Sequence, residues 1–355
     1  MEIATRLSAE TALLRSRLET LTRQAATGQR TERLGELAPE LPRAISLRAE
    51  LGRRETYDRV LTQAQGRAAV MQESLGRLRE IAREFRANVL PRLYSADPVL
   101  LSSARSQARL ALTDMAHLLN LRQAGEYLFS GQDIGNPPIP DPEGLAGGQM
   151  AQDIAAQVAA LGTAGAAAVI AATRGIAQSN APGVSPFSAH LQAQEALPPA
   201  EREARRAAPA ADGELIAYGL TADRNGEAQS RGETTGSWAR DLMRNLMSVA
   251  ALDDSLPAEG EEWAALLAGI RDGFAAAETA LAEESGALGQ AAARMGSAQR
   301  RHRDVSDQLR QQLAAIEEVD LAAALERMQA TRTALEASYR AIASLSELTL
   351  ARFLR

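Results

Sequence analysis

Apolar residues recur at alternating spacings of three and four at both ends of the chain. Near the start they are Leu7, Thr11, Leu14, Leu18, Leu21 and Ala25. Near the end they are Leu321, Leu325, Met328, Leu335, Tyr339 and Ile342, followed by Leu345, Leu348, Leu350 and Leu354. This spacing places a narrow apolar stripe on one side of a helix, as in a coiled coil. We predict that the large apolar residues of these stripes form an assembly seam, through which the termini pair with each other and with neighbouring subunits.

Two further helices are predicted in the first half of the chain. One runs through residues 61–89 and ends before Pro91, because proline lacks a backbone N–H and clashes with the preceding turn. The next begins at Asp97 and Pro98, an N-cap residue followed by proline at the first helical position, and ends near Gly125.

The longest predicted helix covers residues 267–319. At ~1.5 Å per residue it is on the order of 80 Å long, which favours an antiparallel bundle over a compact enzyme domain. Its apolar stripe is interrupted by large polar residues at Glu284, His302 and Gln312. Asp320 is suited to cap a separate C-terminal helix, so a possible hinge is predicted beside it.

The middle of the chain has a different pattern. Proline and glycine gather at 137–148, and a second loose stretch covers 180–212. The best strand signal is ELIAYGLTADRNG (214–226), which ends in the favoured hairpin turn Asn225-Gly226. We predict a small insert with a short β-hairpin and Ala-rich helices.

These patterns predict a mainly α fold. We expect an elongated antiparallel helical bundle with paired terminal coiled-coil helices and a small central insert that contains a short β-hairpin. Residues 1–40 and 318–355 are predicted to form a terminal coiled-coil polymerisation module. Residues 43–135 and 258–317 are predicted to form the bundle domain, and residues 136–257 a variable central insert.

Composition excludes several classes of protein. The chain has 355 residues, with no cysteine and no lysine, which excludes a disulfide framework, a thiol nucleophile, a P-loop lysine and a Schiff-base lysine. The net charge is −6 with both signs interspersed, so nucleic acid and anionic membranes are not expected partners. The first residues lack the basic start and apolar run of a signal peptide, so no cleaved signal peptide is expected.

One uncharged stretch matches a membrane span in length. Residues 154–172 read IAAQVAALGTAGAAAVIAA, but they are mostly alanine and glycine and lack basic or aromatic flanks. An Ala-rich helix is therefore favoured over a membrane span.

No catalytic, cofactor or metal site is predicted. His117, His190 and His302 fall in different segments without the spacing of metal ligands. The stretch 223–226 faintly resembles a calcium loop but lacks its later ligands, so a plain turn is favoured. The paired carboxylates at 283–284 are interpreted as solvated charge.

Three stretches resemble the flagellin superfamily. QAATGQR (24–30) is similar to the end of the first helix of that family, and GEYLFSGQD with NPP (125–138) is similar to the turn that leaves its first bundle domain. EEVDLAAALERMQATRTALEASYRAIASLSELTLARFL (317–354) is similar to its C-terminal helix. Its Leu-Ser-x-Leu-Thr-Leu ending resembles the hook–filament junction subunits more than the filament flagellins. TERLGELAPELP (31–42) departs from the acidic turn usual there.

The resemblance implies a structural subunit of the bacterial flagellum. Such subunits are exported through the flagellar type III channel and polymerise at the hook tip as the adaptor between hook and filament. The implied partners are copies of the chain itself, hook-associated protein 1, flagellin and an export chaperone. An atypical flagellin, or another helical secretion-system or phage structural protein, remains an alternative.

Overall fold

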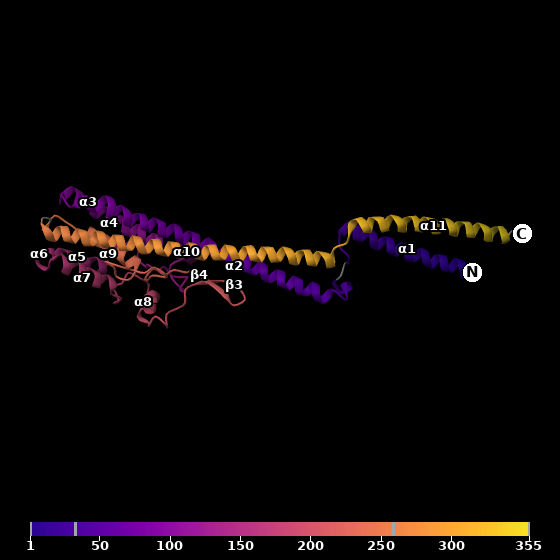
Figure 1. Ribbon diagram of the computed structural model, residues 1–355, viewed down its shortest axis with the longest axis horizontal. Coiled ribbons are helices and arrows are strands. Elements are labelled where there is room, and N and C mark those ends of the chain that lie inside the picture. Colours follow the sequence, from indigo (N-terminus) through magenta and orange to yellow (C-terminus); the bar gives the residue numbers. More distant parts are fainter. Residues whose placement is uncertain (1, 32–33, 258–259, 354–355) are drawn as a thin grey trace. The chain divides into compact units, whose positions relative to one another are not determined.

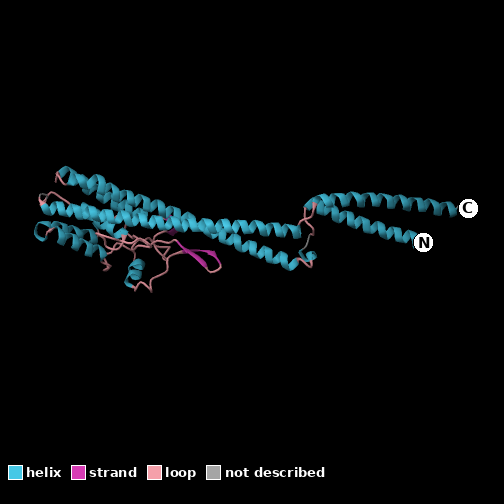
Figure 2. Cartoon of the chain, in the orientation of Figure 1, coloured by secondary structure: helices cyan, strands magenta, loops and turns pink. Residues whose placement is uncertain are grey.

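The computed structural model describes residues 2–31, 34–257 and 260–353, without the side chains of residues 2–4, 34 and 345–353. It is mainly helical, with long antiparallel helices and two small two-stranded sheets (Figures 1 and 2). The predicted fold class is therefore confirmed. The chain divides into two compact units, Met1–Thr56 with Arg301–Arg355, and Tyr57–Arg300.

The first unit contains the two terminal helices. Its elements are α1 (Glu2–Thr27), the 3-10 turn η1 (Leu34–Leu37), the start of α2 (Leu41–Glu84), the end of α10 (Glu261–Glu317) and α11 (Leu321–Phe353). As predicted, Asp320 caps α11, because its carboxylate accepts the backbone N–H groups of Ala322 at 3.0 Å and Ala323 at 3.1 Å.

A small apolar cluster lies where α2 begins and α10 ends. Its buried members are Leu37, Ala44, Leu47 and Ile316. Beside it, the Arg48 guanidinium donates two hydrogen bonds to the carboxylate of Glu317, at 3.0 and 2.8 Å. Hydrogen bonding to this carboxylate raises the pKa of Arg48. The cluster and the ion pair together hold the two helix ends to each other.

The second unit is built on three helices, the remainder of α2, α4 (Pro98–Leu119) and the remainder of α10. The side-chain amide of Gln72 donates to the Ser285 carbonyl at 3.1 Å, and that of Gln65 donates to Ala292 at 3.3 Å, so α2 and α10 run antiparallel. Their apolar stripes share one core with α4. The three-four spacing predicted this packing correctly.

Pro91 does not end the helix where predicted. After α2 the chain forms a π-helical segment, η2 (Phe85–Val89), and then one more turn, α3 (Leu90–Leu93). The Leu90 N–H donates to the Phe85 carbonyl, five residues back. This wider turn accommodates the proline, which lacks the N–H that the next α-helical bond would need.

The middle of the chain folds into short helices and loops. They are η3 (Leu145–Gly147), α5 (Gln149–Ala159), α6 (Leu161–Ala164), α7 (Ala166–Gln178), α8 (Ala189–Ala196) and α9 (Trp238–Ala250). The uncharged stretch thus divides into α5, α6 and α7. Among the described residues no helix is both long and apolar enough to cross a membrane.

The insert contains a β-hairpin, but its turn differs from the predicted one. Strand β3 (Ala207–Ala211) pairs antiparallel with β4 (Glu214–Ala217) across Asp212-Gly213. Gly213 adopts φ +76°, a conformation that such two-residue turns require and glycine tolerates. The predicted strand therefore pairs with the residues before it, and Asn225-Gly226 lies in a loop.

A second hairpin includes the first residues of the motif GEYLFSG (125–131), which resembles the flagellin superfamily. Strand β1 (Arg122–Gln123) pairs with β2 (Glu126–Tyr127) across Ala124-Gly125, and both turn residues have positive φ. The chain then reaches Phe129, whose carbonyl accepts the N–H of Ala222 at 2.9 Å. This contact joins the motif to the YGLTAD segment of the insert.

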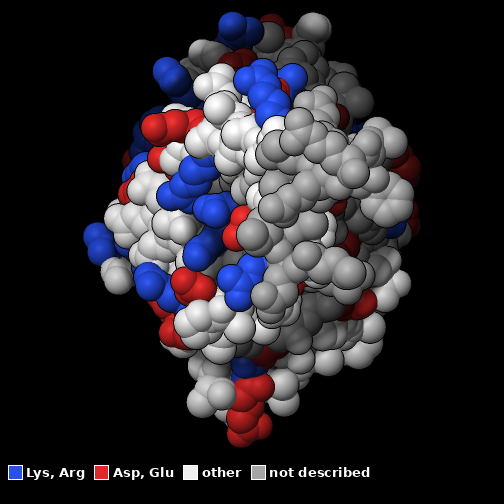
Figure 3. All heavy atoms as spheres, turned by 90° about the vertical axis from the view of Figure 1, so that its right-hand side faces the viewer, with Lys and Arg blue, Asp and Glu red and all other residues white. Residues whose placement is uncertain are grey.

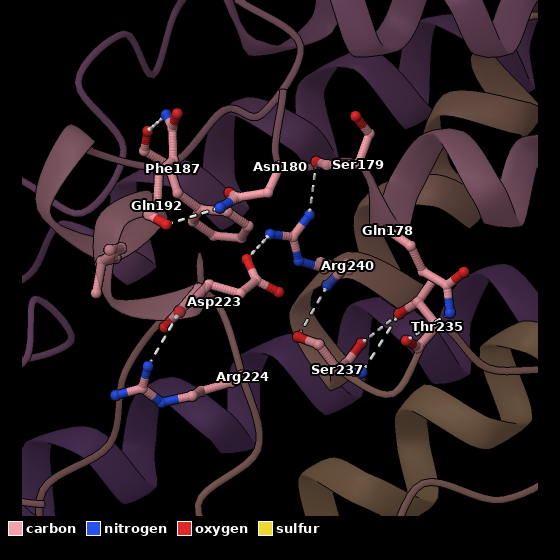
Figure 4. A network of polar contacts seen from close by, with 12 residues as sticks. Gln178, Ser179, Asn180, Phe187, Gln192, Asp223, Arg224, Thr235, Ser237 and Arg240 are labelled. Carbon is pink, nitrogen blue, oxygen red and sulfur yellow. Dashed lines mark hydrogen bonds and ion pairs between the residues drawn. The ribbon is translucent and has the colours of Figure 1, made fainter. Parts of the chain in front are cut away.

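Helix α9 is almost entirely buried, although it carries charged side chains. Its Arg240 is 2% exposed and pairs with Glu195. The guanidinium also donates to the carbonyl of Ala177 in the last turn of α7 and to that of Ser179 just after the helix, the second of which is drawn in Figure 4. The helix begins after Ser237, whose hydroxyl accepts the Arg240 N–H. Buried charges of this kind are tolerated only when paired and hydrogen-bonded, so α9 fixes α7 and α8 in one arrangement.

Candidate assembly surface

Helices α1 and α11 pack against each other along a thin interface. The Thr22 hydroxyl lies 3.7 Å from the Met328 sulfur, and the Arg15 guanidinium carbon lies 5.5 Å from the centre of the Tyr339 ring. The earlier residue of α1, Arg15, contacts the later residue of α11, Tyr339, and the later one, Thr22, contacts the earlier one, Met328. The two helices are therefore antiparallel. The buried side chains between them are Thr11, Leu21, Ala324, Thr331 and Leu335.

The predicted seam residues fall into four groups. Leu21 and Leu335 are buried. Leu7, Leu14, Leu18, Met328 and Ile342 are half-buried. Leu321, Leu325 and Tyr339 are exposed by 48%, 47% and 39%. The side chains of Leu345, Leu348 and Leu350, and all of Leu354, lie outside the described residues.

Helix α11 therefore has two apolar edges. Ala324, Thr331 and Leu335 face α1, whereas the exposed Leu321, Leu325 and Tyr339 lie roughly a fifth of a turn around the helix, at ~100° per residue. We call these three exposed residues the open edge. The contact with α1 covers the first edge. On the open edge the Arg15 guanidinium of α1 lies over the Tyr339 ring, but all three side chains keep more than a third of their surface exposed, so apolar area is left uncovered.

Sequence reasoning missed Ala324 and Thr331 as members of the interface. The signal was the gap of seven residues between Met328 and Leu335, where a coiled-coil stripe requires an inward-facing residue. Thr331 fills that position, and its hydroxyl donates to the Arg327 carbonyl at 2.7 Å. The internal hydrogen bond lets a polar side chain occupy the seam.

The terminal helices also carry a modest excess of positive charge. Their described side chains include seven arginines and four glutamates. Figure 3, turned by 90° from the view of Figure 1, shows basic side chains (blue) on part of one face of the chain with acidic ones (red) beside them. The chain has no lysine, so these basic groups are arginines.

The segment that follows α1 and the segment that precedes α11 are hydrogen-bonded to each other. The Arg30 N–H donates to the Glu317 carbonyl at 2.7 Å, and the Val319 N–H donates to Gly28 at 2.9 Å. Gln29 and Glu318 form an isolated antiparallel bridge between these bonds. The place predicted as a possible hinge is thus held by a short backbone pairing.

The histidines make separate contacts. His117 faces Glu143 at 3.1 Å, His190 faces Glu203 at 3.0 Å, and the ring of His302 faces Arg54 at 3.3 Å. Within the described part of the chain, no three His, Cys, Asp or Glu residues are grouped so that they could hold a metal ion.

The C-terminal part of the chain is similar to a known protein family. Residues 272–354 match the model of the bacterial flagellin C-terminal helical region. The chain carries a flagellin C-terminal region. A comparison with curated proteins found no match.

This flagellin C-terminal region comprises most of α10 and the described length of α11, and it includes the open edge. It agrees with the predicted resemblance to the flagellin superfamily. The match covers less than a quarter of the chain and relates that region to the C-terminal helices of bacterial flagellins.

Proposed function

We propose that this chain is the hook–filament junction subunit, hook-associated protein 3. It polymerises at the hook tip outside the cell and serves as the adaptor between hook and filament. The observation that carries the axial role is the open edge of α11, which lies within the flagellin C-terminal region. The junction role rests on the resemblance of GEYLFSGQD and of the LSELTLARFL ending to junction subunits.

The proposed partners follow from this role. Copies of the chain, hook-associated protein 1 and flagellin contact the terminal module, and an export chaperone binds before secretion. We propose that the predicted seam residues at both ends form the assembly contact. Residues 1–40 and 318–355 act as the polymerisation module, residues 43–135 and 258–317 as the bundle, and residues 136–257 as the variable insert.

Burial of the apolar area on the open edge would stabilise the assembly. A leucine that passes from half exposed to buried gains on the order of 1 kcal/mol, at ~25 cal/mol per Å². Each of the three open-edge residues would contribute an amount of this order in every subunit of a ring. Many weak contacts of this kind add up in an axial assembly, although each is marginal in the single subunit.

Deletion of the gene tests the junction role. The deletion strain is expected to have complete hooks without filaments and to release flagellin into the medium, because nothing retains flagellin on the hook. Electron microscopy of hooks and an immunoblot of the medium measure both outcomes. Normal filaments on the hooks of the deletion strain would show that the chain is not the obligatory junction, and would favour the alternative of a minor flagellin.

A further inference from the structure

Glu284 is a buried carboxylate in the middle of α10, where the sequence suggested solvated charge. It is 0% exposed and accepts backbone hydrogen bonds from three successive residues of one loop. The N–H of Gly226 donates at 2.5 Å, that of Glu227 at 3.0 Å and that of Ala228 at 3.0 Å. A carboxylate held by several backbone N–H groups forms a strong, charge-assisted anchor. The loop is therefore fixed to α10 by one side chain.

The residue before this anchor is Asn225, and both ends of its amide are bonded. Its oxygen accepts the N–H of Trp238, the first residue of α9, at 2.9 Å. Its nitrogen donates to the Ala228 carbonyl at 3.0 Å and to the Ser230 hydroxyl at 2.7 Å. Asn225 thus organises the loop and connects it to the start of α9.

Asn225 is the one asparagine of the sequence that precedes glycine. Glycine has no side chain to shield its backbone nitrogen, so an asparagine–glycine pair is prone to spontaneous deamidation. The Gly226 nitrogen attacks Cγ of Asn225, a new N–C bond forms, and the Cγ–Nδ2 bond breaks. The amide nitrogen leaves as ammonia with the proton lost by the Gly226 nitrogen. Water then opens the cyclic imide to aspartate or isoaspartate.

The folded loop opposes each part of this reaction. The attacking N–H of Gly226 is bonded to Glu284, and the leaving amide of Asn225 is held by two acceptors. We propose that Asn225 is a spontaneous modification site that is closed in the folded chain and open in the unfolded chain. Aspartate or isoaspartate at position 225 therefore accumulates in chains that remain unfolded for a long time.

The product does not fit the folded loop. Aspartate at position 225 has no amide to donate to Ala228 and Ser230. It also adds a negative charge next to Gly226, which is bound by Glu284, and two residues from the buried Asp223. Isoaspartate also inserts a carbon into the backbone and displaces the Gly226 N–H. A deamidated chain is therefore expected to lose the loop anchor and the fixed start of α9.

The test is peptide mapping by mass spectrometry of the purified full chain, kept at mildly alkaline pH either folded or in concentrated urea. Deamidation of Asn225 should be at least about tenfold slower in the folded chain, the factor given by a loop opening free energy of 1.4 kcal/mol. Asn120 and Asn245 precede leucine and serve as slow internal references, and Asn136 precedes proline, which has no N–H to attack. Equal rates with and without urea would overturn the proposal.

Two variants distinguish the effect of the Glu284 anchor on deamidation from the effect of a general loss of stability. Glu284→Gln weakens the acceptor and should accelerate deamidation in the folded chain, whereas Glu283→Gln, beside it, should do so much less. Should Glu284→Gln fail to fold, Ser230→Ala removes one acceptor of the Asn225 amide and should give a smaller acceleration. No acceleration in any folded variant would contradict the anchoring role.

The consequence is tested with Asn225→Asp, the deamidated residue made directly. It should lower the melting temperature of the chain by more than Asn136→Asp does, since Asn136→Asp makes the same chemical change on an exposed residue and loses only one hydrogen bond, to Asp133. An Asn225→Asp protein with unchanged melting would show that the folded loop tolerates the product.

Discussion

The terminal helices and helix α9 bury their side chains in opposite ways. Between α1 and α11 the described buried residues are few, and three large apolar side chains of α11 remain exposed. Twelve of the thirteen residues of α9 are buried, arginines included. The terminal pair leaves apolar area uncovered, whereas the buried charges of Arg240 and Arg244 on α9 are paired within the chain. Exposed apolar area is typical of a surface that binds a partner, which agrees with the assembly role proposed for α11.

The buried charges of the insert are paired across its elements. Glu233 accepts hydrogen bonds from Arg174 of α7 at 3.0 Å and from Arg244 of α9 at 2.7 Å. Removing one member of such a group leaves the others buried and unpaired, which costs more than the group contributes when intact. We therefore expect single substitutions to affect the insert more than the terminal pair.

The largest expected loss of stability comes from Glu284→Ala. It leaves three loop N–H groups without an acceptor, and each costs ~1–3 kcal/mol when buried, so the free energy of unfolding should fall by at least about 3 kcal/mol. Glu283→Ala is the matched control, since it removes the acceptor of the Gln229 N–H only and should cost about 1 kcal/mol. Denaturant unfolding measures both, and equal losses would argue against the anchor.

Leu335→Ala should act on the terminal pair. The side chain is 9% exposed, and its truncation should cost the pairing of α1 with α11 about 2–5 kcal/mol through lost burial and a cavity. Hydrogen exchange of α1 and α11 should rise, while unfolding of residues 57–300 changes little. Leu325→Ala, at an exposed position of the same helix, should leave exchange in the single subunit nearly unchanged. Equal effects of the two variants would contradict the assignment of the edges.

The pH dependence of the insert should show the effect of Asp241. Burial is the main cause that raises the pKa of Asp241 from 3.8, against hydrogen bonds from Thr234 and Thr235. The folded chain therefore binds this proton more tightly than the unfolded chain, and the contribution of Asp241 to stability falls as pH rises from 3.8 through the raised pKa. Asp241→Asn should remove that fall, as measured by melting across this range. An unchanged pH profile would show that Asp241 titrates as it does in the unfolded chain.

The smallest expected effect is a gain at the turn of the first hairpin. Ala124 adopts φ 52°, where a side chain is strained and glycine is not. Ala124→Gly should relieve strain of ~1 kcal/mol, offset in part by the greater freedom of glycine in the unfolded chain, and so raise stability slightly. Ala146→Gly, in the short turn η3, is a control expected to lower it. A lower melting temperature for Ala124→Gly would mean that the strain is absent.

The sequence predicted the helices well because their signals are local. The stripes of α1, α2, α4, α10 and α11 each repeat within a few residues, and the cap at Asp320 acts within one turn. The π segment before Pro91 depends on how the helix packs, which periodicity does not record. The assembly seam stays a prediction, and the division of its residues between a covered edge and an open edge depends on the rotation of α11 against α1, which the sequence pattern does not record.

The role of Glu284 depends on a distant partner. The loop that it binds is 58 residues away at Gly226, and no local pattern relates the two positions. The wrong hairpin turn has the same origin, because the Asn225 amide is used to hold α9 and Asp212-Gly213 forms the turn instead. Long-range hydrogen bonds of this kind are visible only once the chain is folded.

The most direct test of the account compares two exposed leucines. Leu325 lies on the open edge at 47% exposure, and Leu110 lies on α4 at 68% exposure. In a strain that lacks the native gene, Leu325→Arg protein should fold and be exported but not remain on hooks, so that filaments are absent, whereas Leu110→Arg protein should restore them. Electron microscopy of filaments, with immunoblots of hooks and medium, gives the result. Normal filaments with Leu325→Arg would contradict the claim that the open edge of α11 is where subunits assemble.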